Sequence, residues 1–265
     1  MRLLMRFTLA LASAALVWAC ATSPTGRTQI KFVSEAEMAQ MGEQAFAQIK
    51  GQSRQSRDAQ ATELVNCVAG HIIRTLPAKQ RLGWEVVVFD DNMVNAFALP
   101  GRKIGVYEGI FRVARNQHQL ATVLGHEVAH VTAEHANERV STSSLASNAT
   151  QILAAGAGSL AGQQAMGLLG VGLQMGVLMP FNRKQESEAD EIGLQYMAKA
   201  GFDPGQSIPL WENMARVQGG EGPPEFLSTH PSGERRMKDL NARLPEAQAL
   251  RKEAVEGGAK PDCGF

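Results

Sequence analysis

The sequence predicts an α+β fold that is mainly helical, with a small and mostly antiparallel sheet beside one central helix. Apolar residues recur at helical spacing in several long segments, for example on one stripe of residues 59–75. Residues with high strand propensity gather instead between Trp84 and Tyr107, where turn residues interrupt them. The central helix is predicted at Gln117–Glu138, because apolar side chains recur at helical spacing around its histidines.

Length and composition are those of an ordinary globular protein. The chain has 265 residues, of which 44% are hydrophobic and 20% are charged, so it can bury a large core. Lysine plus arginine and aspartate plus glutamate both number 26, and the formal net charge is zero. Without a basic surplus or a cluster of basic and aromatic residues, we expect no nucleic-acid partner. Residues 32–265 are predicted to form a single domain.

Residues 1–19 have the pattern of a secretory signal peptide. A basic start is followed by an apolar run that is too short to span a bilayer. Residues 17–20, Val-Trp-Ala-Cys, resemble a bacterial lipobox, which implies cleavage before Cys20 and acylation of that cysteine. Several acyl chains would anchor the protein to a membrane, and Ala21 favours the periplasmic face of the outer membrane. The alternative is plain secretion to a soluble periplasmic form.

Two more cysteines, Cys67 and Cys263, would then lie in an oxidising compartment. They either form a disulfide that pins the C-terminal tail to an N-terminal helix or remain unpaired, because the sequence does not give their separation in space.

Two helices are expected after a polar, lipidated tether at residues 20–31. The first starts at Ser34, where Glu37 completes a capping box, and runs to about Lys50. The second covers Ala59–Thr75.

Three strands are predicted next, from residue type and turn signals. They are Trp84–Phe89, Val94–Leu99 and Lys103–Tyr107, with a hairpin turn at Pro100–Gly101. The middle strand is rich in small side chains, which suits a strand whose edge lies close to another segment. That segment is either a peptide substrate added as an extra strand or a helix of the same chain. The candidate substrate-binding residues are Asn95, Ala96, Phe97 and Ala98.

Gly125–His130 contains the pattern H-E-x-x-H. On a helix His126 and His130 lie one turn and about 40° apart, so both imidazoles can bind one metal ion. Glu127 can reach a metal-bound water as a general base without binding the metal. The apolar flanks indicate a helix that is half buried, and a metal would satisfy the polar groups that it directs inward.

Residues 140–182 contain no charged residue and are rich in Gly, Ala, Met and Leu. We expect one or two helical segments that gate the cleft beside the metal or touch the membrane. A hairpin that spans the membrane is the alternative, although Gln and Gly weaken each half as a spanning helix.

The next predicted helix, Arg183–Lys199, offers a third ligand. Glu186 and Asp190 lie one turn apart on one face, whereas Glu188 points about 200° away from Glu186. Glu186 can complete a His-His-Glu zinc site, and Asp190 can accept the remaining N–H of a ligating histidine. Acidic residues near a helix start are also common for electrostatic reasons alone.

H-E-x-x-H followed by E-x-x-x-D resembles the gluzincin metallopeptidases that include the CAAX prenyl protease and HtpX, most closely their soluble bacterial lipoprotein members. The resemblance extends from Asn95–Gly101 through Arg183–Asp190 to Thr229-His230-Pro231. It implies a zincin-like metalloprotease domain that binds one Zn²⁺ per chain. The implied roles are zinc ligands for His126, His130 and Glu186, a general base for Glu127, a partner of a ligand for Asp190, and a catalytic role for His230.

His230 has two candidate roles. It either polarises the oxyanion of the reacting carbonyl or occupies the open zinc position in a resting form. Arg235, one turn on, is a weaker candidate for the same oxyanion. The other histidines, at positions 71, 118 and 135, lack ligand spacing, and His135 is expected at the surface or in the core.

Together these patterns predict a zinc-dependent endopeptidase of the bacterial cell envelope that degrades misfolded or misassembled envelope proteins. A chaperone or assembly factor for outer-membrane proteins, with a structural zinc, is the alternative. A metal-dependent hydrolase of non-peptide bonds is a third alternative. No repeat of about 34 residues is expected after Leu244, so the helical-repeat module of some relatives is not predicted. The sequence does not predict an oligomeric state.

Overall fold

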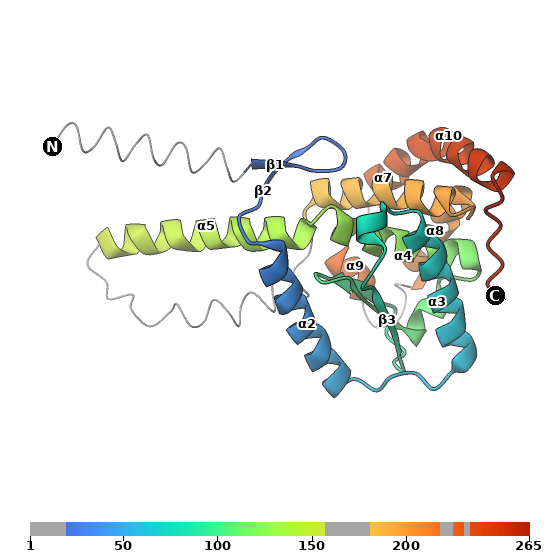
Figure 1. Cartoon of the computed structure of the whole chain (residues 1–265), viewed down its shortest axis with the longest axis horizontal. Helices are drawn as coiled ribbons and strands as arrows, with labels where there is room; N and C mark the ends of the chain where they lie inside the picture. The colour runs from blue at the N-terminus through green and yellow to red at the C-terminus, as the bar shows by residue number, and fades with distance from the viewer. Residues whose placement is uncertain (1–19, 157–180, 218–224, 231–233) are drawn as a thin grey trace.

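The computed structural model describes residues 20–156, 181–217, 225–230 and 234–265 (Figure 1). The predicted signal peptide lies outside these residues, as do residues 157–180 of the charge-free stretch. Within the described part of the chain, every helix is too short or too polar to cross a bilayer. The expected fold is confirmed, because helices dominate and surround a small sheet (Figure 1).

Residues 20–31 form an ordered hairpin rather than a loose tether. β1 (Cys20–Thr22) pairs antiparallel with β2 (Thr28–Ile30). Gln29 is buried and donates through Nε2 to the carbonyl oxygen of Ala133 at 2.8 Å. The expectation of a tether was wrong because the polar side chains of this segment bind other elements of the domain instead of water.

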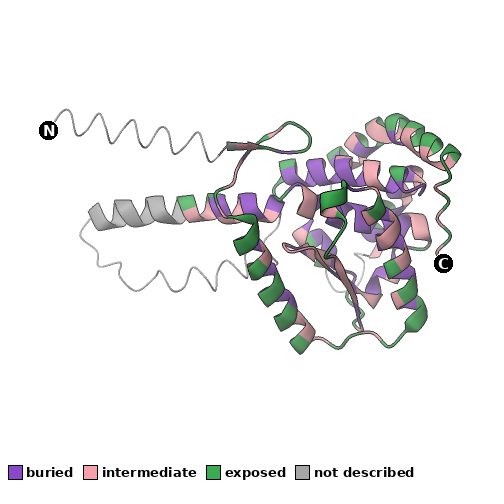
Figure 2. Cartoon of the chain, in the orientation of Figure 1, coloured by how far each residue is buried: buried purple, intermediate pink, exposed green. Residues whose placement is uncertain are grey.

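α2 (Glu35–Gln52) and α3 (Ala59–Arg74) begin and end close to their predicted bounds. The capping box is present, because Ser34 Oγ accepts from the Glu37 N–H and the Glu37 carboxylate accepts from the Ser34 N–H at 3.0 Å. The apolar stripe of α3 enters the main core, while the outer faces of both helices are exposed (Figure 2).

The main sheet lies beside α4 (Gln117–Thr132) and has the strand order β3–β5–β4. Its strands are β3 (Glu85–Phe89), β4 (Ala96–Leu99) and β5 (Lys103–Tyr107). β4 and β5 form the predicted hairpin, with Gly101 at φ 77° and Arg102 at φ 64° in the turn. β5 lies between β3 and β4 and is antiparallel to β4 but parallel to β3. The sheet is therefore mixed, and its edge strand β4 lies next to α4.

The central helix ends earlier than predicted. α4 stops at Thr132, and α5 (His135–Gly156) begins after a break at which Glu134 has a φ of 53°. Glutamate rarely adopts that left-handed conformation, so residue type does not indicate the break. The single helix expected over 117–138 was therefore wrong, and α5 instead extends away from the body of the domain (Figure 1).

The remaining described helices are α7 (Arg183–Lys199), α8 (Ser207–Val217), α9 (Glu225–Thr229) and α10 (Glu234–Glu256). α4 and α7 pack together at the buried centre of the domain (Figure 2). Cys67 of α3 and Cys263 form a disulfide, which settles the pairing left open by the sequence and ties the C-terminal tail to α3.

Candidate metal centre

α4 carries the H-E-x-x-H residues into the interior of the domain. The helix begins after Asn116, whose side chain accepts hydrogen bonds from two backbone N–H groups of the first turn. His126, Glu127 and His130 are only 1–2% exposed. Polar groups buried this deeply need partners, and α7, α9 and α10 supply most of them.

Donor atoms from α4, α7 and the end of α9 converge on one point. His126 Nε2 lies 3.0 Å from His130 Nε2 and 3.2 Å from His230 Nδ1. Glu186 Oε1 lies 3.4 Å from His130 Nε2 and 3.0 Å from His230 Nδ1. A tetrahedral zinc ion with bonds of about 2.0 Å has ligand atoms about 3.3 Å apart, so these separations match the edges of such a tetrahedron. The three predicted ligands are brought together, and His230 joins them.

The chemistry of the donor set also fits zinc. Imidazole nitrogens and a carboxylate oxygen are the ligands of many catalytic zinc sites. Glu127 does not belong to the donor cluster. Its Oε1 is buried, accepts no hydrogen bond from the described residues, and lies 3.4 Å from His230 Nε2. A carboxylate oxygen in that position is available to act as a base beside the metal.

Asp190 lies behind His126, as predicted. Its Oδ1 is 3.0 Å from His126 Nδ1, so it can accept that N–H and leave Nε2 facing the cluster. Arg236, which no sequence pattern indicated, donates through Nε and Nη2 to Asp190 at 2.6 Å each. Its Nη1 lies 2.9 Å from Glu186 Oε2, and its guanidinium lies over the ring of Trp211 at 3.8 Å. One buried cation therefore holds both carboxylates of α7 that face the site.

Arg235, the predicted oxyanion candidate, points away from the site. Its side chain is 89% exposed and pairs with Asp239 at 3.8 Å. The prediction was wrong because neighbouring residues on a helix lie about 100° apart, and only Arg236 faces α7.

His130 is held by a second set of partners. His135 is buried, with Nδ1 2.9 Å from His130 Nδ1 and Nε2 3.1 Å from Glu188 Oε2. From the hairpin, Arg27 Nε and Thr25 Oγ1 donate to Glu188 at 2.8 and 2.6 Å. His135 lies in the core, which is one of the two positions expected for it. Its contact with a metal-ligand candidate depends on the break in the helix and was not predicted.

His230, at the end of α9, closes one side of the site with aromatic neighbours. Its ring stacks on Phe226 with centroids 4.5 Å apart and on Phe181 at 5.3 Å. The Phe181 ring also lies 3.7 Å from the ring of His130. These contacts fix the imidazole planes and keep bulk water from that side of the donors.

Burial and the neighbouring charges shift the pKa values of the site in different directions. Burial lowers the pKa of His126, but Glu186 and a hydrogen bond to a second carboxylate outweigh it and raise the pKa to about 9. Burial holds the pKa of His130 well below its usual value and raises the pKa of Glu127. Burial opposes ionisation of Glu186, but His230 and His126 outweigh it and hold its pKa well below the usual range.

The open edge of β4 faces the site. Asn95 pairs inward, since its carbonyl oxygen accepts from the Tyr107 N–H, and the alternation of the ladder then points the backbone groups of Ala96 and Ala98 outward. The backbone of Ala98 opposes the rise that burial causes in the pKa of the Glu127 carboxyl. The side chain of Phe97 packs in a separate hydrophobic cluster and does not enter the site. Substrate binding by this strand stays a prediction.

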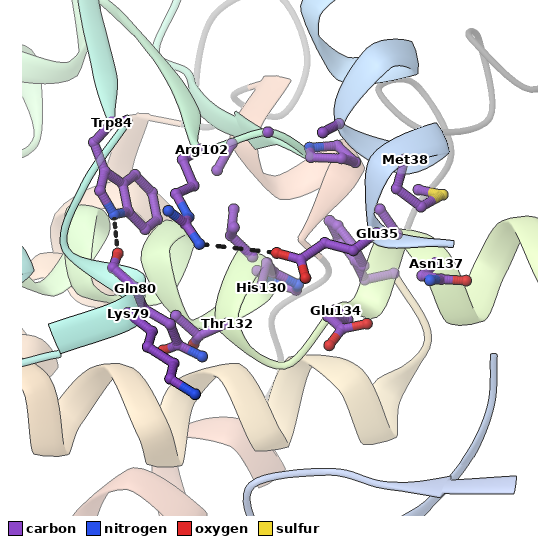
Figure 3. A pocket seen from close by; sticks show the side chains of 18 residues that line it. Glu35, Met38, Lys79, Gln80, Trp84, Arg102, His130, Thr132, Glu134 and Asn137 are labelled. Carbon is purple, nitrogen blue, oxygen red and sulfur yellow. Dashed lines mark hydrogen bonds and ion pairs between the residues drawn. The ribbon is translucent and has the colours of Figure 1, made fainter. Parts of the chain in front are cut away.

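A cavity of about 590 Å³ adjoins the site (Figure 3). His130 and Ala98 line it on the side of the metal ligands, and Trp84 lines it farther out. Arg102 and Glu35 lie 3.8 Å apart at its wall (Figure 3). The cavity therefore lies next to the site on the side of α2 and the β4–β5 turn.

The sequence is similar to those of known metallopeptidases. The model of Peptidase family M48 matches residues 56–244. Mitochondrial metalloendopeptidase OMA1 of Schizosaccharomyces pombe is 43% identical over 171 residues, which cover 64% of this chain and 49% of the relative. The OMA1 of Arabidopsis thaliana is 31% identical over 261 residues, covering 94% and 50%.

A bacterial relative is also found. The β-barrel assembly-enhancing protease of Escherichia coli is 28% identical over 219 residues, covering 80% of this chain and 44% of the relative. The chain thus spans about half the length of the curated relatives that it matches.

Proposed function

The chain belongs to peptidase family M48, and from that membership and the site we propose that it is a zinc endopeptidase. The observation that carries the proposal is the tetrahedral donor set with the buried Oε1 of Glu127 beside it. A carboxylate oxygen buried without a hydrogen bond costs about 1–3 kcal/mol of stability, which a catalytic role explains. His126, His130 and Glu186 are the proposed ligands.

The proposed mechanism assigns the proton transfers to Glu127. A bound zinc ion supplies the Lewis acidity that activates a water molecule and polarises the scissile carbonyl. Glu127 removes a proton from the attacking water and passes it to the leaving amine. Burial raises the pKa of Glu127, which makes it a stronger base than an exposed glutamate. Asp190 accepts a hydrogen bond from His126, and Arg236 holds Asp190, so the imidazole of His126 keeps its orientation during the reaction.

His230 is proposed to occupy the fourth metal position in the resting chain. Its Nδ1 lies among the donor atoms, 3.2 Å from His126 Nε2, which supports this role over polarisation of an oxyanion. His230 would then have to move before a substrate carbonyl could enter. His230→Ala should keep zinc on the three remaining ligands, and loss of zinc as complete as that of Glu186→Ala would refute this role.

The proposed substrate is an extended peptide that binds along β4. The outward backbone groups of Ala96 and Ala98 can pair with such a strand, and the adjoining cavity can receive side chains near Trp84. The small side chains of β4 also suit the packing of α4 against it, and this packing is compatible with the proposed peptide binding.

We also propose a location in the bacterial envelope, with a lipid on Cys20 and unfolded or misassembled envelope proteins as substrates. The leader and the Val-Trp-Ala-Cys pattern of residues 17–20 support it, as does the name of the Escherichia coli relative. The Cys67–Cys263 disulfide suits an oxidising compartment. Other relatives are mitochondrial, so labelling of the intact bacterium with a radioactive fatty acid, and its loss in Cys20→Ser, is the test of the anchor.

Metal analysis tests the ligand set. We expect one zinc ion per chain, loss of zinc in Glu186→Ala, and retention in the matched control Glu191→Ala, because Glu191 pairs with Arg243. Zinc retained by Glu186→Ala would refute the ligand role of Glu186.

Envelope proteomics then tests the function. Cells that carry Glu127→Gln should accumulate the substrates that the wild type removes. Full complementation by Glu127→Gln would instead favour the chaperone or assembly factor with a structural zinc.

A further inference from the structure

A chain of hydrogen bonds joins the N-terminal hairpin to one of the proposed zinc ligands. Thr25 Oγ1 donates to Glu188 Oε1 at 2.6 Å, and Arg27 Nε donates to Glu188 Oε2 at 2.8 Å. Glu188 Oε2 lies 3.1 Å from His135 Nε2, and His135 Nδ1 lies 2.9 Å from His130 Nδ1. Glu188, His135 and His130 are all buried, so bulk water does not compete for these contacts.

The direction of donation along this chain follows from its outer end. The carboxylate of Glu188 beside Arg27 only accepts hydrogen bonds, so the proton of His135 lies on Nε2. The Nδ1 of a neutral His135 then accepts, and Nδ1 of His130 must donate to it. A neutral His130 with its proton on Nδ1 presents the lone pair of Nε2 to the donor cluster, 3.0 Å from His126 Nε2.

We propose that the β1–β2 hairpin positions His130 for zinc through Glu188 and His135. Thr25 and Arg27 hold the Glu188 carboxylate, which orients His135, and His135 sets the ring orientation and tautomer of His130. The inference rests on the proposed zinc function of His130. Glu188 and His135 are positioning residues, since neither belongs to the donor cluster.

The hairpin is fastened at the break between α4 and α5. Arg27 donates through Nη1 and Nη2 to both oxygens of Glu138 at 2.6 and 2.8 Å, and Gln29 holds the Ala133 carbonyl. Arg27 therefore bridges α5 and α7, the helices that carry His135 and Glu188. Displacement of the hairpin would release Glu188 without disturbing the apolar core. Docking of the hairpin and retention of zinc should then favour each other.

Ring ¹⁵N NMR of the full chain, recorded after zinc has been removed, reports the tautomer of each histidine. We expect His130 to carry its proton on Nδ1 in the wild type. In Glu188→Gln we expect a mixture of tautomers, because an amide can donate as well as accept. A wild-type His130 with its proton on Nε2 would overturn the proposal. The result is independent of whether zinc is the physiological metal.

Competition with a chromophoric chelator then measures zinc affinity. We expect Glu188→Gln to weaken zinc binding about 10–100-fold, with smaller losses in Arg27→Ala and Thr25→Val and partial rescue in Arg27→Lys. Arg54→Ala is the matched control, because it removes an exposed ion pair with Asp90 at 2.7 Å that lies outside the hairpin and the helix break.

Thermal unfolding of each metal-free variant checks that it is folded. Should Glu188→Gln fail to fold, the hairpin variants Thr25→Val and Arg27→Ala carry the same test. Wild-type affinity in all these variants would overturn the positioning role and leave the zinc peptidase intact. A wild type that binds no zinc would refute the proposed function. It would also refute the positioning of His130 as a metal ligand, even if the tautomer of His130 is as expected.

Discussion

Gly125 and Gly193 bring the backbones of α4 and α7 into contact. A Cβ atom at Gly125 would lie 2.8 Å from the carbonyl oxygen of Gly193, and one at Gly193 would lie 2.8 Å from the carbonyl carbon of Gly125. Gly125 directly precedes the first proposed ligand, and Gly193 lies about two turns after Glu186 on α7. The absence of both side chains lets the carboxylates of α7 reach the histidines of α4.

Gly193→Ala should therefore force the two helices apart. We expect a loss of about 1–3 kcal/mol in the free energy of unfolding, as for other overpacked cores, together with weaker zinc binding. Gly70→Ala in α3 is the matched control, because its Cβ would meet only Arg74 Nη1 at 3.6 Å and alanine favours a helix by about 1 kcal/mol. Chemical denaturation and zinc titration measure both effects, and equal behaviour of the two variants would contradict the contact.

Arg236→Met tests the cation that holds Asp190 and Glu186. Removal of one partner from a buried ion pair typically costs about 3–5 kcal/mol, and loss of support behind His126 should weaken zinc binding about 10–100-fold. The exposed neighbour supplies the control, since Arg235→Met should leave denaturation and zinc affinity unchanged. Similar losses in both variants would show that charge on α10, rather than this contact, matters.

Zinc binding should depend on pH through His126. Its pKa is raised to about 9 before zinc binds, so zinc must displace a proton at neutral pH. Affinity should then rise about tenfold per pH unit between pH 7 and 9 and level off above. The charged form of His126 stabilises the metal-free chain fully below the unfolded pKa of about 6.5, and that contribution is lost as pH rises through 9. Chelator competition and calorimetry in two buffers measure affinity and proton release, and a flat profile would contradict this charge state.

Much of the site follows from local periodicity. His126 and His130 share a helix face because of the helical repeat, and Glu186 and Asp190 do so for the same reason. The resemblance to a known family then predicted that the two helices contribute to one metal site. The apolar stripe of α3 and the turn signal at Pro100–Gly101 likewise predicted the bounds of their elements to within a few residues.

Long-range polar contacts could not be predicted in this way. Arg27 and Glu188 are 161 positions apart, and nothing in the composition of residues 20–31 distinguishes a docked hairpin from a solvated tether. The break at Glu134 depends on a left-handed backbone that glutamate rarely adopts, and His135 contacts His130 directly after this break. The choice between Arg235 and Arg236 required the start of α10 to within one residue.

Cleavage of unfolded casein by the zinc-loaded wild type and by zinc-loaded Glu127→Gln decides whether this chain is a peptidase with Glu127 as its base. Both proteins should contain one zinc ion, because Glu127 is not among the donor atoms. The wild type should cleave casein, and the rate should fall about 10²–10⁴-fold in the variant, the usual contribution of a general base. Equal cleavage by the two proteins at equal zinc content would contradict the proposed chemistry.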